Sequence, residues 1–233
     1  LRLVGSEMCI RDRVARRALR LCDLFDKKKL LNKVEILLNH HNALLRGFGI
    51  KEYNSNEVTD EIFELGQKVR QYAKAINEIA SEIDNNNQHI LFEGAQGFLL
   101  DIDHGTYPFV TSSNVHASYA PIGSGLSPKL INHILGITKA YTTRVGNGPF
   151  PTELKNETGE KLGEIGHEFG TVTSRKRRCG WFDAVLVRQA MIQSGVTGIA
   201  LTKIDVLDTF DEIKICIGYK LGDAEIDYFP SSE

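Results

Sequence analysis

The segment Gly198-Ile-Ala-Leu-Thr-Lys-Ile-Asp205 (GIALTKID) gives the clearest strand signal in the chain and becomes polar where it ends. Its small and apolar residues predict a buried strand over residues 198–203. The other predicted elements alternate around it, with strands at residues 89–92, 140–145 and 213–218 and helices at residues 129–137 and 182–194. Such alternation is typical of the α/β class and predicts a mostly parallel central sheet flanked by helices.

The N-terminal third of the chain is predicted to be helical from Val14 to Ile83. Apolar residues recur there at intervals of three and four, as one face of an amphipathic helix requires. They are Leu30, Leu31, Val34, Leu37 and Leu38, and then Ile62, Leu65, Val69, Tyr72 and Ile76. We expect a pair of amphipathic helices that cover a sheet, with His40 and His41 on the helix surface.

The composition is that of a soluble globular protein, because 42% of the 233 residues are apolar and 25% are charged. A formal net charge of −2 argues against nucleic acid or a membrane as the partner of the whole surface. No apolar run is long enough to span a bilayer. The four cysteines are scattered without zinc-ligand spacing, as expected for reduced thiols in a cytosolic protein.

The polar end of the GIALTKID segment is a candidate site for guanine. In open α/β sheets, ligands bind beyond the carboxyl ends of the strands. Asp205 can accept two parallel hydrogen bonds from N1–H and the 2-amino group of guanine, and the stem of Lys203 can lie across the base. Adenine lacks that pair of donors. The alternative is a structural turn, since four residues alone are a weak motif.

A second candidate site is the segment from Gly170 to Arg178 (GTVTSRKRR), which combines hydroxyl side chains with four consecutive cations. Arginine binds carboxylate or phosphate oxygens through two parallel hydrogen bonds, so the segment is a candidate anion site. The alternative is a solvated basic loop. Trp181 lies close by in the sequence and is expected to anchor the segment into the fold.

A third candidate site begins at Phe92-Glu-Gly-Ala-Gln-Gly97 and continues through a polar loop. The carboxamide of Gln96 can both donate and accept, which suits the O6 and N1 edge of a purine. Thr111 opens a hydroxyl-rich stretch suited to phosphate. A metal site at Asp101, Asp103 and His104 is the alternative, but the loop has no recognised ligand spacing.

Five motifs together resemble the adenylosuccinate synthetase family, in the order found in that family. They are FEGAQG (92–97), LDIDHGTYPFVTSSN (100–114), TRVGNGPFPTEL (143–154), RKRRCGWFDAV (175–185) and LTKIDVLD (201–208). The resemblance runs from about Val14 to beyond Gly218. Residues 1–13 match neither the rest of the chain nor a start signal, so we expect a non-native or mis-assembled leader and a partial adenylosuccinate synthetase domain over residues 14–233.

This resemblance implies a ligase that forms a C–N bond between inosine monophosphate (IMP) and L-aspartate in purine and AMP biosynthesis. GTP would be the co-substrate and Mg²⁺ the cofactor. The first step would give a 6-phosphoryl-IMP intermediate, from which aspartate displaces phosphate. The family also implies a cytoplasmic homodimer, and a fold related in part to P-loop GTP-binding proteins.

The resemblance further assigns roles by position. The IMP-binding residues would be Arg16 (from the opposite subunit), Gln96, Thr111, Val145 and Arg175, with Gln96 also stabilising the oxyanion. The aspartate-binding residues would be Thr171, Val172, Thr173, Ser174, Arg175, Lys176 and Arg177, with Ser174 where the family usually has glycine. The GTP-binding residues would be Arg177, Lys203, Ile204 and Asp205.

The family's phosphate loop, with its catalytic Asp, the nearby catalytic His and the Mg²⁺ ligands, would lie in an N-terminal segment outside these 233 residues. We therefore expect no metal ligand, general base or general acid in residues 1–233, and no activity from this fragment alone. Two alternatives remain. One is a regulatory GTP-binding module without ligase activity, which predicts a phosphate loop and switch segments. The other is a nucleic-acid-binding protein, which predicts basic residues spread along one face with aromatic platforms.

Overall fold

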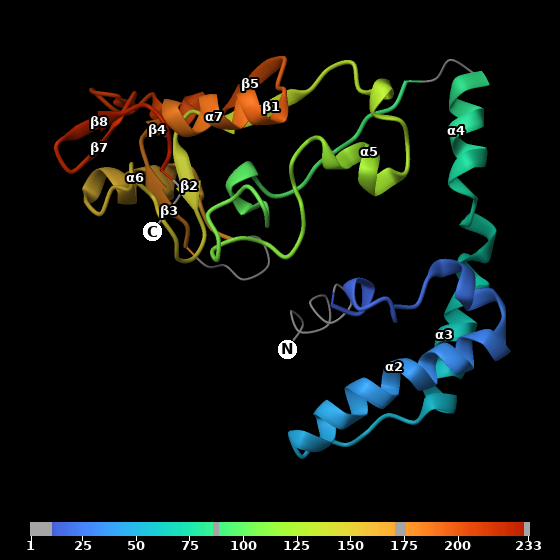
Figure 1. Cartoon of the computed structure of the whole chain (residues 1–233). Coiled ribbons are helices and arrows are strands. Elements are labelled where there is room, and N and C mark those ends of the chain that lie inside the picture. The colour runs from blue at the N-terminus through green and yellow to red at the C-terminus, as the bar shows by residue number, and fades with distance from the viewer. Residues whose placement is uncertain (1–10, 86–88, 171–175, 231–233) are drawn as a thin grey trace. The chain divides into compact units, whose positions relative to one another are not determined.

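The computed structural model describes residues 11–85, 89–170 and 176–230 of the 233-residue chain. The chain divides into two compact units, unit 1 over Leu1–Gln88 and unit 2 over His89–Glu233 (Figure 1). Unit 1 is helical in its described part, and unit 2 combines strands with helices. Among the described residues, none of the helices is both long enough and apolar enough to cross a membrane.

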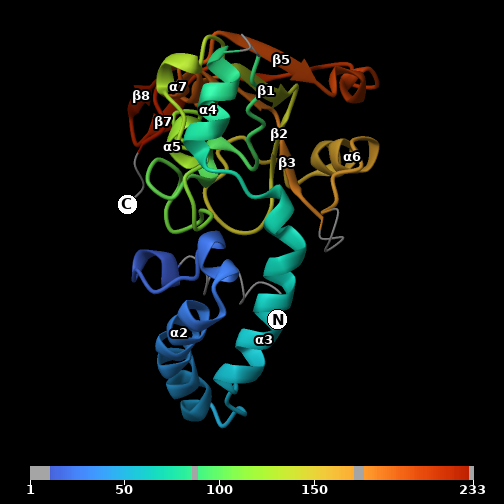
Figure 2. The same ribbon diagram turned by 90° about the vertical axis from the view of Figure 1, so that its right-hand side faces the viewer.

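Unit 1 is built on two helices that pack against each other, α2 and α3 (Figure 2). Its elements are η1 (Leu21–Phe25), α2 (Lys27–Gly47), α3 (Ser55–Val69), η2 (Arg70–Tyr72) and α4 (Ile76–Asn85). Each of the two helices begins at a side-chain cap: the Asp26 carboxylate accepts from the Lys29 amide, and the Asn54 side chain accepts from the Asn56 and Glu57 amides. The predicted helices are therefore confirmed for this region, whereas their expected position over a sheet stays a prediction.

The core of unit 1 follows the four-residue spacing of α2. Leu30, Val34 and Leu38 are buried, and apolar side chains from α3 pack against them. The expected continuation of the second stripe is wrong, because Tyr72 is 78% exposed and the 3-10 turn η2 interrupts the helix there. The surface placement of His41 is also wrong. Its ring is buried, and its Nε2 lies 2.7 Å from a carboxylate oxygen of Asp12.

Unit 2 contains four two-stranded sheets among its described residues. Its strands are β1 (Leu135–Lys139), β2 (Thr142–Arg144), β3 (Arg178–Gly180), β4 (Phe182–Asp183), β5 (Gly198–Thr202), β6 (Ile215–Cys216), β7 (Tyr219–Leu221) and β8 (Ala224–Ile226). Its helices are η3 (Phe98–Leu100), α5 (Tyr119–Ser124), η4 (Pro128–Leu130), α6 (Glu157–Ile165), α7 (Ala184–Ser194) and η5 (Ile204–Leu207). The expected α/β class is confirmed.

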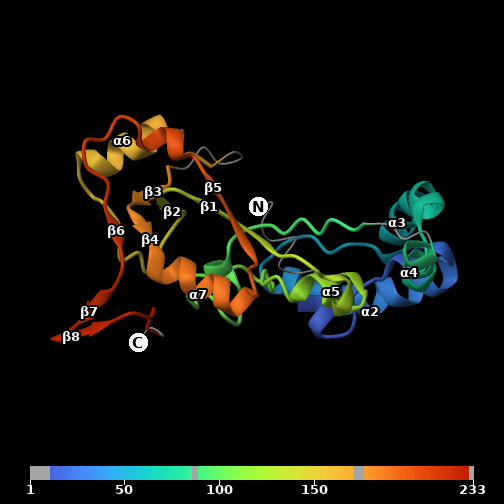
Figure 3. The same cartoon turned by 90° about the horizontal axis from the view of Figure 1, so that it is seen from above.

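Parallel pairing joins β1 to β5 and β4 to β6, and antiparallel pairing joins β2 to β3 and β7 to β8. Strands β1 and β5 lie side by side in register, with Leu135 opposite Gly198 and Lys139 opposite Thr202 (Figure 3). Both strands therefore end at the same edge of the pair. This register brings Lys139 and the residues that come after Thr202 to one place.

Three sequence expectations in unit 2 need correction. The helix expected at residues 129–137 is wrong: η4 is short, and β1 begins at Leu135. Pairing with β5 decides the outcome, and Gly136 allows the Val196 side chain to approach closely. Residues 89–92 form no strand, and Leu91 is 89% exposed. The strand at 198–203 is confirmed as β5, yet Leu201 is 46% exposed rather than buried.

The core of unit 2 lies where β1 passes into β2, against α6, β3 and η5. Its buried members are Ala140, Tyr141, Leu162, Cys179, Val206 and Leu207. Trp181 packs against this cluster, and its ring meets Phe210 edge to face at a centroid distance of 5.9 Å. Trp181 is thus packed into the fold as expected, whereas residues 171–175 of the segment that it was expected to anchor lie outside the described residues. The core fixes the start of β3 and the turn after β5, which carry candidate site residues.

Candidate functional site

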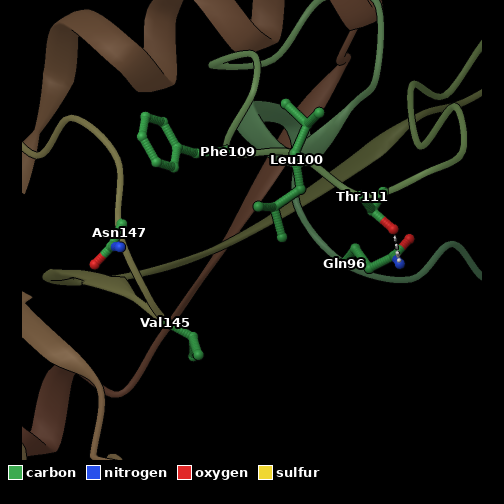
Figure 4. Close-up of a pocket in the computed structure, with 7 residues that line it drawn as sticks. Gln96, Leu100, Phe109, Thr111, Val145 and Asn147 are labelled. Atoms are coloured by element: carbon green, nitrogen blue, oxygen red, sulfur yellow. Dashed lines mark hydrogen bonds between the residues drawn. The ribbon is translucent and has the colours of Figure 1, made fainter. Parts of the chain in front are cut away.

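A cavity of about 420 Å³ in unit 2 brings three of the predicted site residues together (Figure 4). It is lined by Gln96, Leu100, Phe109, Val110, Thr111, Val145 and Asn147. The Gln96 carboxamide donates a hydrogen bond to the Thr111 hydroxyl, with an Nε2–Oγ1 distance of 3.0 Å. Val145 and Asn147 come from the segment after β2. The volume lies in the range that suits a small ligand.

The backbone at Gln96 is held in an uncommon conformation. Its φ of +68° lies in the left-handed region, where a residue other than glycine is strained. Gln96 stands between Ala95 and Gly97 in the FEGAQG motif (92–97) identified from the sequence. The strain is typical of functional positions, although the assigned role of Gln96 toward a purine stays a prediction.

The polar loop that carries Thr111 is organised around the fully buried carboxylate of Asp101. It accepts hydrogen bonds from the backbone amides of Asp103 (2.9 Å), His104 (3.0 Å), Val115 (2.6 Å) and His116 (3.1 Å). Burial alone would raise the pKa of Asp101, but these backbone donors outweigh it and lower the pKa to about 2. Asp101 is therefore an ionised structural centre of the loop.

Arg144, at the end of β2, ties the same loop to the strand. Its Nη2 donates to the Thr106 hydroxyl at 2.8 Å and to the Phe109 carbonyl at 2.9 Å. Burial, and secondarily the nearby Arg178 charge, lower the pKa of this guanidinium. Arg144 directly precedes Val145, which lines the cavity, and it also binds the carbonyl of Phe109, which lines the cavity from the loop. The end of β2 therefore positions lining residues from both segments.

A second polar centre surrounds Glu168, whose side chain is completely buried. Both carboxylate oxygens lie 2.8 Å from Lys139 Nζ, and one of them accepts from the Tyr141 hydroxyl at 2.6 Å. Arg177 Nη1 donates to the other oxygen at 2.8 Å. Lys203 Nζ lies 3.5 Å from the carboxylate. One anion therefore contacts three cations from separate segments.

The charge states around Glu168 depend on this arrangement. Burial alone would raise the pKa of Glu168, but hydrogen bonds and charge from Lys139, with Tyr141 and Arg177, lower it to about 2. Burial is also the largest cause that raises the pKa of Tyr141, and the adjacent carboxylate adds to it. The pKa of Lys139 is lowered by burial, with partial compensation from Glu168. Glu168 is thus held as an anion.

The predicted guanine-reading residues come directly after β5. Lys203 has a φ of +56°, which turns the chain sharply into η5. Its ammonium donates to the Gly166 carbonyl, next to Glu168. Ile204 and Asp205 are exposed, so the Asp205 carboxylate is accessible to a ligand. The structure places Lys203 beside the Glu168 centre.

The basic segment is only partly described. Thr171, Val172, Thr173, Ser174 and Arg175 lie outside the described residues, so their predicted roles stay predictions. Lys176 is exposed, Arg177 pairs with Glu168, and Arg178 forms two hydrogen bonds to the Glu153 carboxylate at 2.7 and 2.6 Å. A second cavity, of about 270 Å³, is lined by Glu153, Leu154, Gly159, Glu160, Lys176, Arg177, Arg178 and Cys179.

Arg16 is the one predicted site residue in unit 1. Its side chain is exposed and its φ is +61°. Its contact with a monophosphate in the opposite subunit stays a prediction. Within the described residues, no group of three or more His, Cys, Asp or Glu side chains is placed to hold a metal ion. Asp101, the alternative metal ligand, instead accepts backbone hydrogen bonds.

Sequence reasoning missed Glu168 and Arg144. Glu168 stands in a glycine-bearing polar stretch, and its partners Lys139 and Lys203 are far away in the sequence. No local pattern marks such a residue. Arg144 had a weak signal, because it is the only cation in the short strand AYTTRV and directly precedes a predicted site residue.

The fold and site define an α/β protein whose polar loops form a cavity of ligand size near the ends of paired strands. A family model described as adenylosuccinate synthetase matches residues 4–233. The chain therefore belongs to the adenylosuccinate synthetase family, and the resemblance drawn from its motifs is confirmed.

A solved structure of the same family agrees with this assignment. The chain is similar to the fully ligated adenylosuccinate synthetase from Plasmodium falciparum, with 36% sequence identity and a TM-score of 0.81. That match covers 90% of this chain and 49% of the other, so the chain spans about half the length of that protein. A cyanophage S-2L succinoaminodeoxyadenylate synthetase, bound to dGMP and to dATP as an energy donor, matches at 20% identity and a TM-score of 0.49, covering 85% of this chain and 71% of the other.

Proposed function

We propose that this chain forms part of an enzyme that joins IMP to L-aspartate, with GTP as co-substrate, to give adenylosuccinate in AMP biosynthesis. The observation that carries the proposal is that Gln96, Thr111 and Val145 line one cavity, with Gln96 and Thr111 in hydrogen-bond contact. A carboxamide suits the purine edge, a hydroxyl suits a phosphate, and an apolar side chain suits a ribose face. Family membership supports the same assignment.

The proposed reaction has two steps. The O6 atom of IMP attacks the γ-phosphorus of GTP, the bond to the bridging oxygen breaks, and GDP leaves as the proton on N1 is removed. The amino nitrogen of aspartate then attacks C6, the C6–O bond breaks, and phosphate departs while the nitrogen loses a proton. Gln96 would donate a hydrogen bond to O6 as negative charge develops there. We assign no general base or acid to this chain.

GTP would be recognised at the turn after β5. The exposed Asp205 carboxylate would accept hydrogen bonds from N1–H and the 2-amino group of guanine. Arg177 would contact GTP and aspartate through guanidinium N–H groups that are not used by Glu168, since a guanidinium carries five such donors. Thr171 to Lys176 would complete the aspartate site.

Mg²⁺ would supply charge neutralisation to the phosphates of GTP when bound. The described residues offer no cluster suited to a metal ion, so no step is assigned to this chain through it. The proposal also includes a cytoplasmic homodimer, in which Arg16 of one subunit would reach the IMP of the other. Its exposed side chain supports such a contact.

Product formation by the intact protein tests the proposal. Adenylosuccinate should appear only when IMP, aspartate and GTP are all present, with ATP a poor substitute. The Asp205→Asn variant should lose activity with GTP and gain activity with xanthosine triphosphate, whose 2-oxo group can accept from the new amide. An unchanged preference for GTP would show that Asp205 does not read the base. Absence of adenylosuccinate with wild-type protein would reject the ligase assignment.

A further inference from the structure

Glu168 contacts two segments to which the proposed function assigns ligand roles, the one that carries Arg177 and the turn after β5. Arg177 directly precedes β3 and pairs with one carboxylate oxygen at 2.8 Å. Lys203 comes directly after β5 and lies 3.5 Å from the other oxygen. The carboxylate is completely buried, so water does not screen these contacts strongly. Both cations therefore contact one fixed anion.

The contacts around Glu168 are unequal in strength. Lys139 lies 2.8 Å from both oxygens and Tyr141 donates at 2.6 Å, so these partners hold the carboxylate in place. Lys203 has the longest contact, and its side chain is 39% exposed. Its ammonium also donates to the Gly166 carbonyl. Of the three cations, Lys203 has the longest contact with Glu168 and the most exposed side chain, so its position should change most when the anion is removed.

The backbone at Lys203 makes this anchoring consequential. Its φ of +56° sets the turn that starts η5, and Asp205 lies two residues further on with its carboxylate exposed. When the Lys203 head is fixed on Glu168 and Gly166, the lysine stem has one direction. The stem and the Asp205 carboxylate would then offer a preset frame to a flat base, which would lower the entropy cost of binding.

We propose that Glu168 is a positioning residue for the guanine nucleotide: its buried carboxylate holds the Lys203 ammonium, and with it the turn that carries Asp205, while also holding Arg177. This inference rests on the proposed function, because it assumes that the turn after β5 binds guanine. Replacing the carboxylate by a neutral amide leaves Lys139, Arg177 and Lys203 facing one another without an anion. Like charges in a buried space repel, and Lys203 should turn outward.

The test is equilibrium binding of GTP, measured by titration calorimetry on the intact protein. Glu168→Gln should weaken GTP binding about tenfold, the loss expected for one mispositioned charged contact. Tyr141→Phe is the matched control, because it removes a hydrogen bond to the same carboxylate but leaves its charge and its cations. Its GTP affinity should remain within about twofold of wild type.

A double-mutant cycle separates positioning from general damage. If Glu168 acts through Lys203, the loss of GTP binding caused by Glu168→Gln should be smaller when Lys203 is already alanine than in the wild-type background, and the remaining loss comes through Arg177. Glu168→Asp keeps the charge and shortens the side chain, so the same cycle can be run with it if the amide variant does not fold. Glu168→Asp alone should weaken GTP binding about threefold.

Three results would overturn the inference. They are unchanged GTP binding by both Glu168 variants, equal losses in Glu168→Gln and Tyr141→Phe, and additive losses in the cycle with Lys203→Ala. A wild-type protein that binds no GTP would instead reject the proposed function. The two failures are therefore distinguishable.

Discussion

The loop around Asp101 and the cluster around Glu168 both bury a carboxylate, but they satisfy it in opposite ways. Asp101 accepts from four backbone amides of its own loop, so its partners are neutral and close in the sequence. Glu168 accepts hydrogen bonds from the side chains of Lys139, Tyr141 and Arg177 and forms an ion pair with Lys203, so its partners are mostly cations and come from several segments of the chain. The first arrangement shapes one loop, whereas the second ties several elements to one point.

This difference predicts the largest stability effect at Glu168. Glu168→Gln should lower the free energy of unfolding by about 3 kcal/mol, because it removes the fully buried anion that three partly exposed cations share. Tyr141→Phe should cost only about 1 kcal/mol, the net value of one hydrogen bond. Urea unfolding of both variants measures the two values. Equal losses would mean that the cations around Glu168 do not depend on its charge.

Acid should remove the same stabilisation in the wild-type protein. The folded pKa of Glu168 is about 2, below its ordinary value of 4.5, so its contribution is fully present above pH 4.5 and is lost as the pH falls toward 2. The shift corresponds to about 3 kcal/mol. Unfolding free energies across this window should fall less steeply for Glu168→Gln. Parallel curves for variant and wild type would contradict the ionised state of Glu168.

Asp101→Asn should have a smaller and more local effect, about 2 kcal/mol, because the amide loses charge-assisted hydrogen bonds from the loop backbone. Hydrogen exchange should become faster at the amides of Val115 and His116 and remain unchanged at β1 and β5. Faster exchange in β5 would show that this centre is not confined to its loop.

The smallest effect is expected at the cavity surface. Thr111→Val removes the hydroxyl that accepts a hydrogen bond from Gln96. Because this contact is exposed, the free energy of unfolding should fall by only about 0.5 kcal/mol. Thr111→Ser keeps the hydroxyl and serves as the control. IMP binding should weaken in the valine variant and persist in the serine variant. Equal IMP affinity in both variants would remove Thr111 from the phosphate site.

The sequence predicted the elements whose signals are local. The amphipathic spacing of Leu30, Val34 and Leu38 identified α2, and the apolar run before Lys203 identified β5. The helix expected at residues 129–137 was wrong, because residues 135–139 form a strand that pairs with β5. The local sequence shows how apolar residues are spaced, but the tertiary fold determines which strand a segment pairs with.

In the candidate site, too, residues in local motifs were predicted and a residue defined by tertiary contacts was missed. Gln96, Thr111 and Val145 were singled out from motifs, and the structure brings them to one cavity, although their assigned ligands stay predictions. Glu168 was missed, because its importance comes only from Lys139 and Lys203 meeting it in space. A buried ion cluster assembled from separate segments leaves no spacing in the sequence.

The most direct test of the difference between the Asp101 loop and the Glu168 cluster is to measure the binding of IMP and of GTP to Asp101→Asn and Glu168→Gln. The measurements are made at a temperature where both variants keep the circular dichroism spectrum of the wild type. Asp101 organises one loop and Glu168 contacts several segments, so each variant should mainly weaken the binding of a different ligand. Asp101→Asn should weaken IMP binding and spare GTP, and Glu168→Gln should weaken GTP binding and affect IMP less. Equal losses of affinity for IMP and for GTP in both variants would show that the two buried carboxylates do not act on different parts of the protein.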